Sequence, residues 1–177
     1  LDVCDWTTFA TMTVEDGSVV LPSGMRYRYL VLPNGARYTP KALEKVAELV
    51  QAGATVIGDK PSRSPSLNDY LRADQAIQQL AAELWPQTDG AGERRVGKGR
   101  VITGKTFETI FEEDALSPDF HANSTFSDSE VRYIHRKLAT GEMYYVSNQK
   151  ERVEELVLNF RVTGFVPEAW DPVTGEK

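Results

Sequence analysis

The side chains with the clearest capacity for binding chemistry are concentrated in the C-terminal third of the sequence. They combine guanidinium, imidazole, phenol, amide and indole groups at Arg132, His135, Arg136, Tyr144, Tyr145, Asn148 and Trp170. On an extended strand, Arg132 and Arg136 share one face and His135 lies on the other, because side chains alternate. Such a mixed polar and aromatic surface can contact sugar or a neighbouring domain. The pattern favours an ordinary exposed sheet face with cross-strand pairs over either contact.

Residues 92–99, GERRVGKG, nearly match a phosphate-binding loop. The two glycines and Lys98 have the required spacing, but Gly99 stands where the motif needs Ser or Thr to hold magnesium. A β-favouring segment follows, whereas phosphate binding by this motif needs a helix N-terminus. The sequence therefore predicts a hairpin turn here, and no nucleotide or other cofactor is expected.

Other patterns for catalysis or metal binding are weaker still. Cys4 is not part of a nucleophile elbow and is predicted to be a buried structural thiol. Asp119 and His121 are close in sequence, but no second pair of ligands follows at the spacing of a metal site. The acidic run at 112–114 is typical of a solvated helix end. We therefore predict no catalytic residue and no metal ligand.

Composition excludes several partners. The chain has 177 residues, a formal net charge of -6 and a single cysteine. An acidic chain does not attract phosphate backbones, so nucleic-acid binding is not expected. No apolar run approaches the roughly 20 residues of a membrane span. The first residue is Leu and no signal peptide is visible, which favours an excised or processed piece of a longer protein.

The elements that would position these side chains begin with a β-rich stretch. Residues 9–21 predict two short strands around an Asp-Gly turn, and residues 27–32 predict a buried strand. Thr39 and Pro40 then start an amphipathic helix that ends near Gly53, and residues 54–58 predict a second buried strand. Strand, helix and strand together predict a βαβ unit with parallel strands.

A second helix is predicted over residues 67–85, with a buried stripe that includes Leu71, Ile77, Leu80, Ala81 and Leu84. A hairpin around 95–102 and a short helix over 106–113 follow. Residues 117–129 are rich in Ser, Pro, Asp and Asn, and predict a connector. Beyond it, residues 131–138, 143–147, 153–162 and 165–170 predict antiparallel strands. The expected organisation is an α/β domain over 1–116, a connector over 117–129 and an antiparallel tail over 130–177.

Many short segments also resemble, in order, the middle part of bacterial α-L-rhamnosidases of glycoside hydrolase family 106. The segments are residues 2–5, 20–27, 30–33, 49–61, 64–67, 97–101, 118–120, 132–136, 144–148, 160–164 and 167–172. Each is short, but their common order over nearly the whole chain is specific.

The resemblance implies a multidomain periplasmic or secreted enzyme that removes rhamnose from plant glycans, with a catalytic barrel outside this chain. It also implies a flavodoxin-like fold, related to class I glutamine amidotransferases and to the trimerisation domains of some β-galactosidases. None of the family's catalytic or calcium-binding residues maps onto this chain. A central strand is expected just before Leu1, and its loss would leave an exposed sheet edge or gap.

Three functions remain open at this point. The chain is expected to be a non-catalytic accessory module that contacts other domains of a parent glycoside hydrolase. The alternatives are an independent carbohydrate-binding module that uses Tyr144, Tyr145 or Trp170 for stacking, and a small flavodoxin-like nucleotide binder. A homo-oligomer is also a possible arrangement.

Overall fold

We describe a computed structural model of the chain, covering all residues except 1, 36, 67–68 and 88–89. It divides into two compact units, Leu1–Thr109 and Ile110–Lys177. Among the described residues, no helix is both long and apolar enough to cross a bilayer. The strand expected before Leu1 lies outside the described residues.

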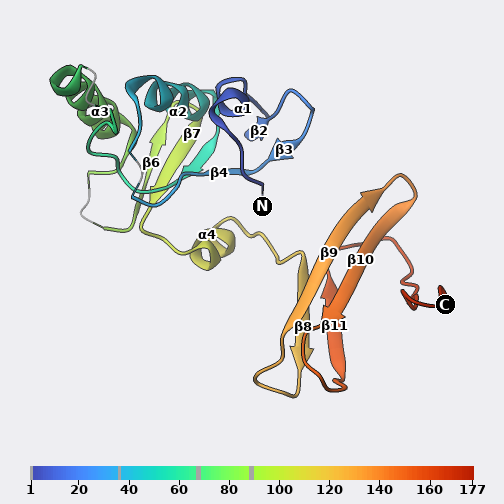
Figure 1. Cartoon of the computed structure of the whole chain (residues 1–177). Coiled ribbons are helices and arrows are strands. Elements are labelled where there is room, and N and C mark those ends of the chain that lie inside the picture. The colour runs from blue at the N-terminus through green and yellow to red at the C-terminus, as the bar shows by residue number, and fades with distance from the viewer. Residues whose placement is uncertain (1, 36, 67–68, 88–89) are drawn as a thin grey trace. The chain divides into compact units, whose positions relative to one another are not determined.

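The N-terminal unit contains two small sheets (Figure 1). After helix α1 (Trp6–Ala10), strands β1 (Thr13–Glu15), β2 (Ser18–Val20) and β3 (Arg26–Tyr27) form an antiparallel sheet. A second sheet has the order β4-β5-β7-β6, with strands β4 (Tyr29–Val31), β5 (Thr55–Ile57), β6 (Gly92–Val96) and β7 (Gly99–Thr103). Strands β4, β5 and β7 are parallel, and β6 runs antiparallel to β7.

Helices α2 (Pro40–Ala52) and α3 (Tyr70–Leu84) supply nearly half of the buried core residues of this unit. Helix α2 begins where Thr39 accepts a hydrogen bond from the Ala42 amide, and it ends at Gly53. Its apolar stripe is fully buried against β5, β7 and α3, together with the Trp85 side chain. Burial of this stripe, rather than helix propensity, stabilises α2.

The expected flavodoxin-like, amidotransferase-like fold is wrong. Those folds need a long parallel sheet with successive βα units, whereas this unit has short strands in one antiparallel and one mixed sheet. The local β4–α2–β5 unit is parallel as predicted. After β5 the chain supplies α3 and then the β6–β7 hairpin, in which β7 is the third and last parallel strand and β6 ends the sheet in antiparallel orientation.

Several predicted elements differ in detail. Residues 27–32 do not form one buried strand, because β3 pairs in the first sheet and β4 in the second. Leu71, predicted to be buried, lies exposed in the first turn of α3, whereas Ile77, Ala81 and Leu84 are buried as predicted. Leu67, where that helix was expected to begin, lies outside the described residues.

The C-terminal unit holds the end of helix α4 (Phe107–Glu113) and four strands. Strands β9 (Val131–Leu138) and β10 (Gly141–Asn148) form an antiparallel hairpin. Strands β8 (Phe120–Ser124) and β11 (Leu156–Phe160) form a second antiparallel pair. The predicted antiparallel pairing holds for β9 and β10, whereas β11 pairs with β8 instead of with the strand before it. Residues 165–170 form no strand. Strand β8 lies inside the predicted connector, and it forms there because apolar Phe120 and Ala122 alternate with polar neighbours.

Aromatic rings join the two strand pairs. The ring of Phe120 on β8 lies 4.7 Å from that of Tyr133 on β9, and the ring of Phe160 on β11 lies 4.7 Å from that of Tyr144 on β10. Tyr133 and Tyr144 therefore mark the inner face of the β9–β10 hairpin, which packs on β8 and β11.

A polar network on the C-terminal strands

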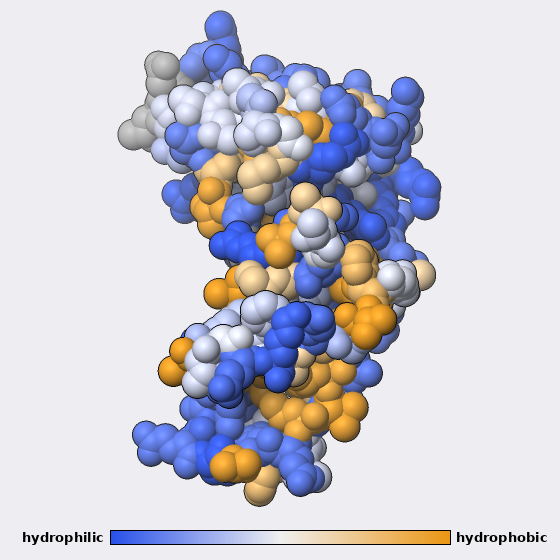
Figure 2. Space-filling view, turned by 90° about the vertical axis from the view of Figure 1, so that its right-hand side faces the viewer, coloured by the Kyte–Doolittle hydropathy of each residue, from blue (hydrophilic) through white to orange (hydrophobic). Residues whose placement is uncertain are grey.

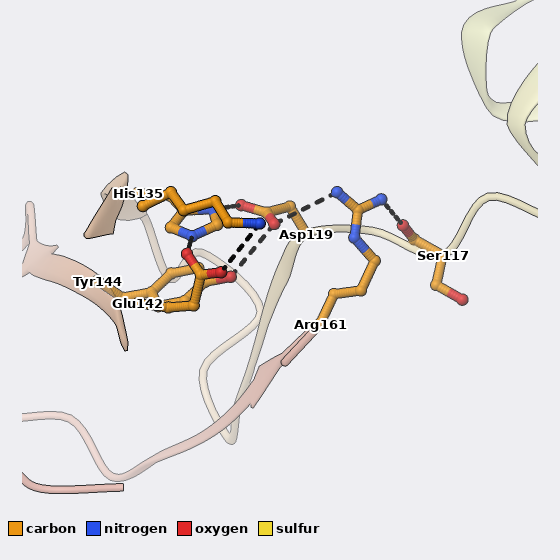
Figure 3. A network of polar contacts seen from close by, with 7 residues as sticks. Ser117, Asp119, His135, Glu142, Tyr144 and Arg161 are labelled. Atoms are coloured by element: carbon orange, nitrogen blue, oxygen red, sulfur yellow. Dashed lines mark hydrogen bonds and ion pairs between the residues drawn. The ribbon is translucent and has the colours of Figure 1, made fainter. Parts of the chain in front are cut away.

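A network of polar side chains lies at one end of this aromatic layer (Figure 3). Its central members are Asp119, just before β8, His135 on β9, Glu142 and Tyr144 on β10, and Arg161, just after β11. The antiparallel register places His135 directly opposite Tyr144. The network thus gathers side chains from all four strands or their immediate ends.

The imidazole of His135 is held between two carboxylates. Its Nδ1 lies 2.9 Å from Oδ2 of Asp119, and its Nε2 lies 2.9 Å from Oε2 of Glu142. The ring also stacks on Tyr144, with centroids 4.0 Å apart and planes at 14°. Both ring nitrogens are therefore occupied by protein groups.

The second oxygen of Asp119 completes the network. Its Oδ1 accepts a hydrogen bond from the Tyr144 hydroxyl at 3.2 Å and lies 3.4 Å from Nη2 of Arg161. Arg161 also donates from Nη1 to the Ser117 carbonyl at 2.9 Å. Partial burial, followed by the negative charge of Asp119, raises the pKa of Tyr144 above its usual value. Tyr144 therefore remains a hydrogen-bond donor at neutral pH.

A second polar cluster ties the loops of the same unit. The Glu154 side chain has no exposed surface, and its Oε2 accepts hydrogen bonds from the hydroxyls of Ser124 and Ser129. Nη2 of Arg152 lies 2.9 Å from the other oxygen, and the same guanidinium pairs with both oxygens of Asp128. The Ser129 hydrogen bond is the main reason that the pKa of Glu154 lies below its usual range.

The seven side chains predicted to contact sugar or a neighbouring domain do not gather in one place. His135 and Tyr144 meet in the network, whereas Arg132, Arg136 and Tyr145 alternate with them and belong to the opposite face of the hairpin. Asn148 donates to the Arg152 carbonyl. Trp170 donates to Glu168, and the ammonium of Lys177 lies 4.7 Å from its ring centroid.

Three members of the network were missed as site residues. Asp119 was weighed only with His121, but it binds His135, while His121 contacts Asn123. Neither Glu142 nor Arg161 is part of a catalytic or metal-binding motif in the sequence. The signal for Glu142 was the hairpin register, which pairs it with Lys137, two residues beyond His135 on the same face.

The near-match to a phosphate-binding loop is the β6–β7 hairpin, as predicted. Its glycines serve close packing, since a Cβ on Gly97 would lie 2.7 Å from both the Cα and the carbonyl oxygen of Gln51 in α2. Cys4 is exposed rather than buried, because it precedes α1 in a segment with no covering element. No group of metal-ligating side chains occurs in the described part of the chain.

Comparison with known proteins decides the family. The sequence profile of the α-L-rhamnosidases, glycoside hydrolase family 106, matches residues 5–177. The chain belongs to this family. The rhamnosidase of Novosphingobium sp. PP1Y is 36% identical, with a TM-score of 0.83 over 94% of the chain. A Formosa agariphila protein named "Putative beta-glucuronidase" is 30% identical over 174 residues, 98% of the chain.

The chain spans only a small part of these relatives. It covers 16% of the Novosphingobium rhamnosidase and 14% of the Formosa agariphila protein. Membership of the α-L-rhamnosidase family therefore applies to these 177 residues, which correspond to a small share of the length of such proteins.

Proposed function

We propose that this chain is a non-catalytic accessory module of an α-L-rhamnosidase-like glycoside hydrolase that acts on plant glycans. The observation that carries the proposal is the placement of His135 between Asp119 and Glu142. Glycoside hydrolysis needs two carboxyl groups on either side of the scissile bond, with a sugar between them. Here an imidazole occupies that space and binds both carboxylates.

The chemistry of the network supports a structural role instead. A general base needs a nitrogen or oxygen within reach of a substrate proton, but both nitrogens of His135 contact carboxylates. Asp119 is also held by Tyr144 and Arg161. These contacts join β9 and β10 to the ends of β8 and β11, so they stabilise the relative placement of the two strand pairs.

The direct test is incubation of the purified chain with an aryl α-L-rhamnoside. We expect no release of the aryl group, whereas a complete enzyme of the family serves as the positive control. Turnover by the chain that disappears in Glu142→Gln would overturn the proposal, because that variant removes a carboxylate while preserving side-chain shape.

Other parts of the proposed role rest on the family resemblance. The parent enzyme is proposed to be periplasmic or secreted, and the partners of the module are proposed to be its other domains. Calorimetric titration with plant oligosaccharides tests the competing role in sugar binding. Binding at about millimolar affinity or tighter, roughly -4 kcal/mol or stronger, would favour a carbohydrate-binding module.

A further inference from the structure

The two strand pairs of the C-terminal unit have outer faces of different character. On β8 and β11 the outward side chains include His121, Asn123 and Asn159, and Nε2 of His121 lies 2.9 Å from the Asn123 amide oxygen. Val157 is the apolar exception there, with 64% exposed. This is the alternation of a sheet with one buried and one solvated face.

The outer face of the β9–β10 hairpin carries exposed apolar side chains together with Arg132 and Arg136. Side chains that alternate with the inner Tyr133, His135 and Tyr144 point to this face. The exposed fractions of its apolar members are 55% for Ile134, 50% for Leu138, 47% for Met143 and 49% for Tyr145. Figure 2 shows hydrophobic residues gathered on the surface of the C-terminal unit. We call these four residues the outer patch.

The patch spans both strands and has an arginine within it. Tyr145 pairs with Ile134 across the hairpin, and Met143 pairs with Arg136, which lies between Ile134 and Leu138 on the same face. A Cβ on Gly141 would lie 3.9 Å from the ring of Phe165, so that exposed phenyl group extends the patch at the turn. Exposed apolar side chains gathered on one face are typical of an interaction site, and arginine is enriched in such surfaces.

We infer that the outer patch docks onto another part of the parent polypeptide, outside residues 1–177, through an apolar surface that presents carboxylates to Arg132 and Arg136. The inference rests on the accessory function proposed above. The two relatives contain further polypeptide that could be such an occupant, because the chain covers only 14% and 16% of their lengths. The arginines supply the charge preference, because opposite charges across an interface favour the correct partner.

A second copy of the chain fits this face less well. Two identical hairpins packed face to face would bring together surfaces that each carry Arg132 and Arg136. Like charges placed together in an interface oppose association. The formal net charge of -6 on each chain adds a longer-range repulsion between copies.

Thiol labelling measures coverage of the patch directly. In a Cys4→Ser background, Ile134→Cys reports on the outer patch, and Val157→Cys is the matched control on the opposite outer face. Both variants are made in the chain of 177 residues and in the complete polypeptide encoded by the same gene. Labelling with a maleimide is followed by mass spectrometry of the intact protein.

We expect both thiols to react rapidly in the chain of 177 residues. In the complete polypeptide, Ile134→Cys should react at least about tenfold more slowly, as expected when a side chain is covered in a stable contact, while Val157→Cys keeps its rate. Adding Arg136→Glu should restore at least part of the labelling rate at position 134.

Three results would overturn the inference. The first is equal labelling of position 134 in the two proteins, and the second is a gene that encodes no further polypeptide. The third is protection of position 134 that rises with the concentration of the 177-residue chain, because that would identify a second copy as the occupant. Rhamnoside turnover is measured separately. Unprotected position 134 with an inactive chain rejects the docking surface alone, whereas turnover by the chain rejects the accessory function.

Discussion

Substitution of Gly97 by Ala tests why the β6–β7 hairpin carries its glycines. Gly97 has a φ of 59° and lies against the C-terminal end of α2, where a Cβ would meet the Cα and the carbonyl oxygen of Gln51 at 2.7 Å. The Lys98 amide donates to that same carbonyl at 3.1 Å. The hairpin is thus fixed to the helix, and neither backbone can move away without losing a hydrogen bond.

The expected loss has two parts. A left-handed conformation costs an alanine about 1–2 kcal/mol, and forcing an extra methyl into a packed contact costs about 1–3 kcal/mol. Gly35→Ala is the matched control, because Gly35 has a φ of 62° with nothing within 4 Å of its Cβ position. The reduced entropy of the unfolded chain applies equally to both variants. Gly97→Ala should therefore be less stable than Gly35→Ala by about 1–3 kcal/mol.

Urea unfolding followed by tryptophan fluorescence measures this difference. A Trp170→Phe background restricts the signal to Trp6 and Trp85, which both lie in the N-terminal unit. With a slope of about 1–3 kcal/mol/M, the two midpoints should differ by roughly 1 M. Equal midpoints would refute the packing argument and leave the glycine motif unexplained. A thermal shift on adding nucleotide would instead favour the phosphate-binding interpretation.

Two further substitutions test polar contacts in the two units. Trp85→Phe should lower the free energy of unfolding by about 2–4 kcal/mol, because it leaves a cavity and removes the hydrogen bond from the indole to the Gly58 carbonyl. A loss below about 1 kcal/mol, measured by urea unfolding, would contradict this prediction. The folded-state pKa of Glu154 is depressed, so its contribution is present above pH 4.5 and is lost as pH falls through that lower pKa. Thermal midpoints of the wild type should therefore fall more steeply below pH 4.5 than those of Glu154→Gln, and parallel curves would show that Glu154 does not control acid stability.

Local signals predicted single elements better than the fold. Helix α2 has a side-chain cap at Thr39, Pro40 in its first turn and Gly53 at its end, so its limits followed from interactions within a few residues. The flavodoxin-like fold class rested on the family resemblance and on one local βαβ unit, and neither determines how the later strands pair. Whether β6 continues the parallel sheet or turns back depends on a hairpin that places Gly97 against Gln51. That contact between distant residues has no periodic signature.

The polar network also depends on strand pairing, and part of it can be predicted once the register of the β9–β10 hairpin is known. His135 and Tyr144 were predicted as members of one set of contact residues, but only the hairpin register shows that they stack. Once Gly141 is placed opposite Leu138, strand alternation assigns Glu142 and Tyr144 to the face of His135. Asp119 and Arg161 enter the network from the ends of β8 and β11, and the pairing of those two strands was not predicted.

The same register carries the functional argument. A shift of one residue in the β9–β10 pairing would place His135 opposite Tyr145, so that His135 and Tyr144 would lie on opposite faces of the hairpin. The observed register instead brings His135 and Tyr144 together beside the aromatic layer and leaves the outer patch exposed. The hydrogen bonds around His135 and the ring contacts of Tyr133 and Tyr144 therefore determine which face of the hairpin is the inner one. The same pairing leaves the outer patch on the face that is free to dock.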